Sequence, residues 1–202
     1  LERTSKFLKE TQEVAQIGGW EVNMRSETMR GSREVYRIHG LTQGAHLTPE
    51  DGIEFYHPDD REIIREAFDR LVTEGEQYDL ELRFVTTDDD VRWVRTRGEP
   101  RYKNDEIVAV HGTIQDITER KERERELQRI EQAVESAGHA IFITDPDGTI
   151  EYVNPAFEEL TGFSQAEVVG ETPHVLNSDE MADEYFEALW ETLNSGDVWE
   201  AE

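Results

Sequence analysis

The sequence changes from strand to helix within residues 107–118, which read Ile107-Val-Ala-Val-His-Gly-Thr-Ile-Gln-Asp-Ile-Thr118. The apolar run at its start predicts a β-strand. At its end, the side chains of Asp116 and Thr118 can accept hydrogen bonds from the free N–H groups of a following helix. Residues 119–138 are mostly strong helix formers, with Glu and Arg repeatedly four positions apart. We therefore expect a helical linker over 119–138 that continues directly from the last strand of a sheet.

The segments on either side of this linker repeat each other. A polar helix start at 32–40 recurs 122 positions later at 154–162, and a helix stopped by Gly at 67–75 recurs 121 positions later at 188–196. The first copy then continues through three strands, expected at 78–84, 91–97 and 107–114. The second copy ends where the first of these strands begins. The repeat predicts two copies of one architecture, the second lacking its last two strands.

Two local patterns also predict how side chains are placed. Period-two alternation puts four apolar side chains on one face of a strand, namely Tyr78, Leu80, Leu82 and Phe84. In the second copy, Asn154 precedes Pro155, which is the pattern of a helix cap followed by proline at the first helical position.

The composition is strongly acidic. In total, 47 Asp and Glu against 21 Lys and Arg give a formal net charge of −26. Residues 17–118 have 22 acids and 13 bases, net −9, while residues 139–202 have 16 acids and no Lys or Arg, net −16. Such a surface repels phosphate groups, which excludes a nucleic-acid groove and direct contact with an anionic membrane. Because only four bases are Lys and aromatic residues are well represented, we expect a folded protein adapted to a salt-rich cytoplasm.

Several chemical functions are excluded by residues that the sequence lacks. Without cysteine there is no disulfide, zinc thiolate site, iron–sulfur cluster or thiol-linked chromophore. No phosphate-binding glycine loop, nucleophile elbow or metal-binding histidine pair is present, so we expect neither catalytic residues nor a metal site. No apolar run approaches the roughly 20 residues of a membrane span. We expect a cytoplasmic, non-enzymatic chain that is part of a longer protein, because it starts without Met inside a predicted helix over 1–16.

Short motifs in both copies together resemble tandem PAS domains, which are sensory modules of histidine kinases and related regulators of bacteria and archaea. In the first copy they are Ile17-Gly-Gly-Trp20, Tyr36-Arg-Ile-His-Gly40, His57-Pro-Asp-Asp60, Arg92-Trp-Val-Arg95 and Gly112-Thr-Ile-Gln-Asp-Ile-Thr118. In the second copy they are Ile143-Thr-Asp-Pro-Asp-Gly148, Tyr152-Val-Asn-Pro-Ala-Phe157 and Leu160-Thr-Gly-Phe163. The turns at Asp88-Asp-Asp90 and Asn104-Asp105 depart from the family pattern because they lack the usual Gly.

The resemblance implies an α+β fold in which a five-stranded antiparallel sheet carries helices on one face. The fold would occur twice in tandem, with the second copy truncated and a helix joining the two. The implied parts are an N-terminal helix at 1–16, a PAS domain with a trailing PAC motif at 17–118, the linker at 119–138, and a second PAS domain at 139–202. We expect the truncated second domain to have a poorly closed sheet and to be less ordered than the first.

The resemblance also implies a sensory input module of a two-component signalling protein. It would bind a small ligand or partner and relay the change through helices to an output domain outside this chain, most simply a histidine kinase. Asp116 and Thr118 match the motif that couples the last strand to the output helix. Two alternatives stay open, namely a structural dimerisation spacer with filled cores and the input region of a transcription regulator.

The family pocket lies between the sheet and the helices, and the resemblance favours the second domain as the place for a ligand. Its candidate cofactor-binding residues are Phe142, Asn154, Phe157, Asn177, Trp190 and Trp199. The cofactor stays unknown. A non-covalent flavin is open, haem is less favoured because it needs His57 or His174 turned inward as axial ligand, and a small apolar ligand is a further alternative.

The linker predicts how the chain associates with a second copy. Its apolar residues form a thin stripe at Ile117, Leu127, Ile130, Val134 and Ala137. This stripe suits a short coiled coil in a homodimer, and a solvated spacer is the equally weighted alternative.

Overall fold

The computed structural model describes residues 16–26 and 28–176, and the chain divides into two compact units between Arg125 and Glu126. The predicted N-terminal helix at 1–16 lies almost wholly outside the described residues, and so does the end of the second copy, where the first of its last three strands was expected to begin.

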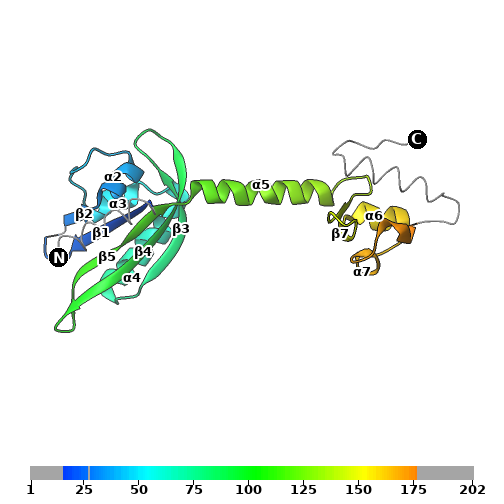
Figure 1. The fold of residues 1–202 in the computed structure, drawn as a ribbon. Helices are drawn as coiled ribbons and strands as arrows, with labels where there is room; N and C mark the ends of the chain where they lie inside the picture. The colour runs from blue at the N-terminus through cyan, green and yellow to red at the C-terminus, as the bar shows by residue number, and fades with distance from the viewer. Residues whose placement is uncertain (1–15, 27, 177–202) are drawn as a thin grey trace. The chain divides into compact units, whose positions relative to one another are not determined.

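The first unit contains a five-stranded antiparallel sheet with the strand order β2-β1-β5-β4-β3 (Figure 1). This confirms the predicted fold class. The strands are β1 (Ile17–Asn23), β2 (Thr28–Gly31), β3 (Tyr78–Val85), β4 (Val91–Lys103) and β5 (Glu106–Asp116). The helices between them are α2 (Arg33–His39), α3 (Pro49–Glu54), a 3₁₀ turn η1 (Pro58–Asp60) and α4 (Arg61–Thr73).

Helices α2, α3 and α4 cover one face of this sheet. Their buried residues Val35, Ile38, Ile53, Ile64 and Leu71 form a single core with inward-facing residues of the strands, namely Trp20, Val22, Leu82, Phe84, Val94, Val110 and Ile114. The alternation predicted for 78–84 is confirmed, since Leu82 and Phe84 are buried and Tyr78 and Leu80 pack against the same core. The core therefore lies between the sheet and the three helices, where the pocket of the first unit also lies.

The two turns without Gly are built from Asp and Asn in left-handed conformations. Asp89 has φ 63°, Asn104 has φ 52° and Asp105 has φ 64°. Short side chains that bond to the local backbone let Asp and Asn adopt this region at lower cost than other L-residues. The departure from the family pattern therefore leaves the β3–β4 and β4–β5 connections intact.

Helix α5 (Thr118–Glu135) follows β5 after a single residue, Ile117. The linker was predicted at 119–138, so the helix begins one residue earlier and ends three residues earlier than expected. None of its residues is buried.

The described part of the second unit has β6 (Phe142–Thr144) and β7 (Ile150–Val153), followed by α6 (Pro155–Thr161), α7 (Gln165–Val168) and a 3₁₀ turn η2 (Pro173–Leu176). The two strands form an antiparallel pair. A small core joins them to the helices through Ile150, Val153, Phe157 and Val168. As predicted, Asn154 caps α6: its side chain accepts a hydrogen bond from the backbone N–H of Phe157, and Pro155 is the first helical residue.

Candidate ligand cavity and helix junction

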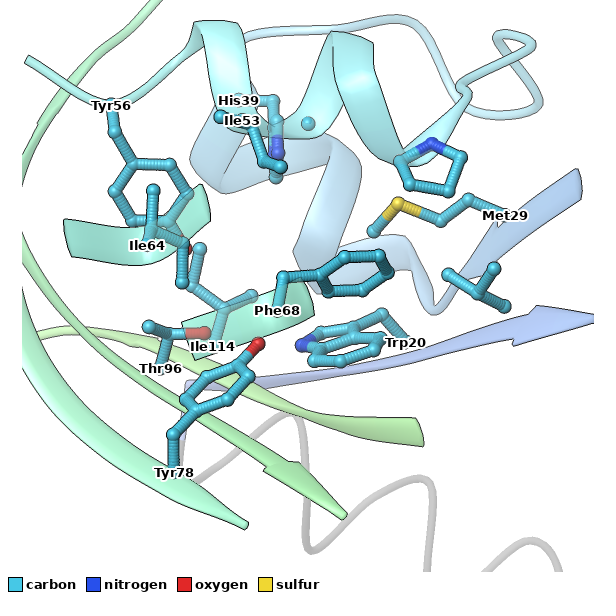
Figure 2. A pocket seen from close by; sticks show the side chains of 13 residues that line it. Trp20, Met29, His39, Ile53, Tyr56, Ile64, Phe68, Tyr78, Thr96 and Ile114 are labelled. Atoms are coloured by element: carbon cyan, nitrogen blue, oxygen red, sulfur yellow. The ribbon is translucent and has the colours of Figure 1, made fainter. Parts of the chain in front are cut away.

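A cavity of about 50 Å³ lies between the sheet of the first unit and helices α3 and α4 (Figure 2). Strands, helices and loops distant in the sequence all contribute to it. Its lining residues are Trp20, Val22, Met29, His39, Pro49, Gly52, Ile53, Tyr56, Ile64, Phe68, Tyr78, Thr96 and Ile114. None of these thirteen is Asp, Glu, Lys or Arg, so the lining is apolar apart from a few uncharged polar groups.

Three hydroxyl groups form one side of the cavity. Thr96 on β4 is 1% exposed, and its hydroxyl is close enough to the hydroxyls of both Tyr56 and Tyr78 to affect their pKa values by hydrogen bonding. Burial raises the pKa of Tyr56 to about 12 and raises the pKa of Tyr78 as well. Both phenols therefore remain protonated and neutral at physiological pH.

His39, the last residue of α2, is the histidine that lines the cavity. Its Nδ1 lies 2.7 Å from the carbonyl oxygen of Val35, and its ring meets the rings of Phe55 and Phe84 edge-on at 4.8 Å. Burial lowers the pKa of His39 to about 4. Because a carbonyl only accepts hydrogen bonds, the neutral ring carries its proton on Nδ1, which leaves Nε2 as the acceptor nitrogen.

Two facing glycines make room for the aromatic rings of the cavity. Gly98 on β4 pairs with Gly112 on β5. A Cβ on Gly98 would lie 2.5 Å from the Tyr78 ring, and a Cβ on Gly112 would lie 2.5 Å from the Trp20 ring. Both rings therefore pack closely against the glycine backbone, and both border the cavity (Figure 2).

A second, wider groove adjoins the cavity. It has a volume of about 430 Å³ and is lined by Val22, Met24, Thr48, Pro49, Glu50 and Phe68. Val22, Pro49 and Phe68 line both spaces. The partly buried ring of Phe68, from α4, therefore lies between the cavity and the groove.

The predicted relay residues meet at the junction of β5 and α5. Asp116 accepts hydrogen bonds through Oδ1 from the backbone N–H of Thr118 at 3.0 Å and from its hydroxyl at 2.6 Å. The Thr118 hydroxyl oxygen in turn accepts a bond from the backbone N–H of Trp93 at 3.0 Å. The N–H of Ile117 donates to the Trp93 carbonyl at 2.8 Å. The start of α5 is thus bonded to both β4 and β5. The capping prediction is confirmed for Asp116 and is wrong for Thr118, whose hydroxyl bonds to Asp116 and Trp93 rather than to an N–H group of α5.

Side chains attach the first turns of α5 to β3 and β4. Glu81 on β3 pairs with Arg120 at 2.6 Å and with Lys121 at 2.8 Å. The hydrogen bond from Lys121 is the main reason why the pKa of Glu81 is lowered. Lys121 and Arg125 also lie over the Trp93 ring, at 5.4 and 5.2 Å from its centre. Cation–π contacts of this kind add to the attachment.

In the second unit, the structure brings three of the six predicted cofactor residues together. The rings of Phe142 and Phe157 meet at 6.1 Å, and Phe157 is 1% exposed in the small core. The fully buried Asn154 accepts bonds from the N–H groups of Ile141 and Phe157 and donates to the carbonyls of Val134 and His139. All four hydrogen-bonding positions of its amide are therefore used by backbone. The other three, Asn177, Trp190 and Trp199, lie outside the described residues.

The histidines considered as haem ligands are placed elsewhere. His57 caps η1 through Nδ1, which accepts a bond from Asp59 N–H at 3.4 Å, and His174 is exposed on η2. Neither lines the cavity of the first unit. His39 was missed as a site residue, although Val35, Ile38 and His39 have the spacing of one apolar helix face and could have indicated its position.

The described residues contain no group of three or more His, Cys, Asp or Glu side chains placed to hold a metal ion. No helix among them is long and apolar enough to cross a membrane.

Comparison with known proteins identifies both units. Residues 28–114 match one family model described as PAS fold, and residues 128–202 match a second with the same description. The sensor protein FixL of Bradyrhizobium diazoefficiens is 26% identical over 165 residues, which are 79% of this chain and 33% of that protein. The blue-light-activated histidine kinase of Brucella ovis is 34% identical over 112 residues, 55% of this chain and 22% of that protein.

A solved structure agrees with these matches. The sensory box histidine kinase/response regulator from Burkholderia thailandensis E264 is 27% identical, with a TM-score of 0.52, covering 62% of this chain and 95% of that chain. The chain spans about a third or less of the length of the curated relatives it matches. On these grounds the chain belongs to the PAS family and carries two PAS domains in tandem.

Proposed function

We propose that this chain is the sensory input region of a signalling protein, and that the first PAS domain passes its state to an output domain through the β5–α5 junction. The observation that carries the proposal is the hydrogen-bond network of Asp116, Thr118 and Trp93, which bonds the first residue of α5 to two strands of the sheet. The histidine kinases among the relatives make a kinase the favoured output.

The path from the cavity to this junction is short. Thr96 and Ile114 line the cavity and face each other on β4 and β5. Asp116 lies two residues beyond Ile114, which is about 7 Å along a strand. A change in the hydrogen bonds of Thr96 therefore alters strand positions next to the cap of α5, and the helix moves with the strands that hold its first turn.

Homodimerisation through α5 is part of the proposal. Leu127 and Ile130 are 68% and 57% exposed, and with Val134 they have the three- and four-residue spacing of a coiled-coil seam. Large exposed apolar residues in register on an otherwise charged helix favour pairing with a second copy.

Further features of the proposal concern the second domain and the cell. The ring pair of Phe142 and Phe157 supports a ligand pocket there, completed by Asn177, Trp190 and Trp199, with non-covalent flavin as one candidate. The net charge of −26 with only four Lys supports a cytoplasmic protein of a salt-rich cell. The alternatives are a structural dimerisation spacer and the input region of a transcription regulator.

Helix-phase insertions in the full-length protein test the proposed relay. Two residues inserted between Arg125 and Glu126 rotate the distal helix by about 200°, whereas seven residues rotate it by only about 20° from its original phase. We expect the two-residue insertion to abolish or invert regulation of the output activity and the seven-residue insertion to preserve it. Unchanged regulation after the two-residue insertion would favour the spacer.

A further inference from the structure

The first-domain cavity suits a ligand without net charge. Its polar groups are the neutral His39 ring, the indole N–H of Trp20 and the hydroxyls of Tyr56, Tyr78 and Thr96, and its other lining residues are apolar. A buried ionised group needs an opposite charge or several hydrogen bonds, and these lining residues offer no opposite charge. The negative charge of the whole chain also disfavours an anion.

One hydroxyl proton of the cavity can be donated to a ligand. Tyr56, Tyr78 and Thr96 carry three hydroxyl protons, and hydrogen bonds between Thr96 and the two tyrosines can use at most two of them. The third proton is left to donate to another acceptor, such as the oxygen of a ligand. On the helix side of the cavity, Nε2 of His39 is an acceptor that suits a ligand hydroxyl.

Size limits the ligand further. A volume of about 50 Å³ holds one or two water molecules, whereas an apolar cavity of roughly 150 Å³ is needed for benzene. Flavin and haem need still more space, since pockets for ligands of that size have volumes of about 300–1,000 Å³. As it stands, the cavity is therefore too small for a ring compound.

Phe68 provides the additional space. Its ring lies between the cavity and the groove of about 430 Å³, and it packs only partly buried against the core. Turning the ring into the groove vacates a space of the size and shape of a six-membered ring next to the hydroxyl groups. A ring compound in that space would conserve the packed volume, which is the substitution that cores tolerate best.

We propose that the first PAS domain binds a small uncharged ring compound with one hydroxyl or carbonyl group, which displaces the Phe68 ring toward the groove and bonds to the hydroxyl cluster around Thr96. The inference rests on the proposed input function and adds the class of ligand to it.

Phenol, toluene and benzoate are suitable probes, since they share a ring and differ in hydroxyl group and charge. The chain has three Met residues, and ¹³C-methyl NMR of the full chain reports on each of them. Met29 lines the cavity, Met24 lines the groove, and Met181 belongs to the second unit as an internal reference. We expect phenol to shift the Met29 signal saturably without shifting Met181, and benzoate to bind at least tenfold more weakly than phenol.

Variants separate the two parts of the proposal. Thr96→Val should weaken phenol binding by about five- to tenfold, the worth of a hydrogen bond, and leave toluene binding within twofold. Phe68→Ala should tighten the binding of phenol and of toluene by on the order of tenfold, because no ring has to be displaced. Phe68→Leu serves the same purpose if Phe68→Ala unfolds. Ile63→Ala, an exposed position on the same helix, is the matched control and should change nothing.

The proposal is overturned if phenol fails to shift Met29 in both the wild type and the Phe68 variants, if benzoate binds as tightly as phenol, or if Phe68→Ala weakens binding. These results are separable from the relay. Helix-phase insertions that still alter the output, together with a failure of phenol to bind, would reject the ligand class and retain the proposed function.

Discussion

The hydroxyl oxygen of Thr118 accepts a hydrogen bond from the backbone N–H of Trp93 at 3.0 Å, so the first residue of α5 is bonded to a strand that it follows by 25 positions. This contact makes the helix start an extension of the sheet. Its consequences for stability and relay can be measured separately.

Replacing Thr118 tests the contact directly. Thr118→Val keeps the shape of the side chain and removes the hydroxyl, so the Trp93 N–H and the Asp116 carboxylate each lose a partner. We expect a loss of about 1–2 kcal/mol in the free energy of unfolding of the first unit. Chemical denaturation measures this, and Thr118→Ser, which keeps the hydroxyl, should lie within about 0.5 kcal/mol of the wild type.

The facing glycines give a second prediction. Gly112→Ala would place a Cβ 1.8 Å from the Arg97 carbonyl oxygen and 2.5 Å from the Trp20 ring. Neither the strand backbone nor the buried indole can move away easily, so we expect a loss of about 3 kcal/mol or more. Gly19→Ala on β1 is the control, since nothing lies within 4 Å of its Cβ. Equal melting temperatures for the two variants would refute this account of the packing.

His39 gives a pH dependence. Its pKa is about 4 in the folded state and about 6.5 when unfolded, so the unfolded state binds the proton more readily between these values. The stability that this lowered pKa contributes to the folded state is therefore complete above pH 6.5 and is lost as the pH falls toward 4. Lowering the pH from 7.5 to 5.0 should cost about 2 kcal/mol of stability through this residue.

Comparison with His39→Gln isolates this contribution. Asp60, Asp79 and Glu81 also have lowered pKa values, so they too reduce stability as the pH falls. The difference between the wild type and His39→Gln in urea denaturation removes these shared effects. Parallel pH profiles for the two proteins would contradict the burial of a neutral imidazole.

Asn154 predicts a local effect in the second unit. Asn154→Asp replaces the amide donor with an ionised oxygen facing the carbonyls of Val134 and His139. We expect a loss of about 3 kcal/mol, since two acceptors lose their donor beside a buried charge. Hydrogen exchange should show loss of protection at β6, β7 and α6, with β1–β5 unchanged. Asn154 variants as protected as the wild type would show that the four bonds are dispensable.

The α5 stripe predicts a change in association. Replacing both Leu127 and Ile130 with Glu should raise the dimer dissociation constant at least tenfold, because it puts charges into the proposed seam. Sedimentation equilibrium measures the constant. Gln128→Glu, an exposed position between them, should leave it within about twofold.

Local chemistry explains what the sequence predicted. Asp116 could be identified because capping needs a particular side chain at a particular step before a helix, and Asp116 does accept a hydrogen bond from the N–H of Thr118. Thr118 was expected to do the same, but it is itself the first residue of the helix and its hydroxyl bonds to Asp116 and Trp93. The alternation in 78–84 likewise reflects a repeat of two residues, which is independent of distant contacts.

The cavity could not be predicted in the same way. His39, Tyr56 and Thr96 come from a helix, a loop and a strand, and each looks like an ordinary core or surface residue in its own segment. Their meeting depends on strand register, such as the pairing of Gly98 with Gly112. The family resemblance instead led to the expectation of a ligand in the second domain, where the structure describes only three of the six proposed residues.

Amide hydrogen exchange at Lys121 tests the relay most directly, because its N–H donates to the Ile117 carbonyl in the first turn of α5. Thr96→Val changes the cavity without touching α5. If the cavity and the helix start are coupled, Thr96→Val should speed exchange at Lys121 by about tenfold, which corresponds to 1.4 kcal/mol, while Ile63→Ala leaves it unchanged. Exchange at Lys121 that is the same in Thr96→Val and the wild type would contradict the account.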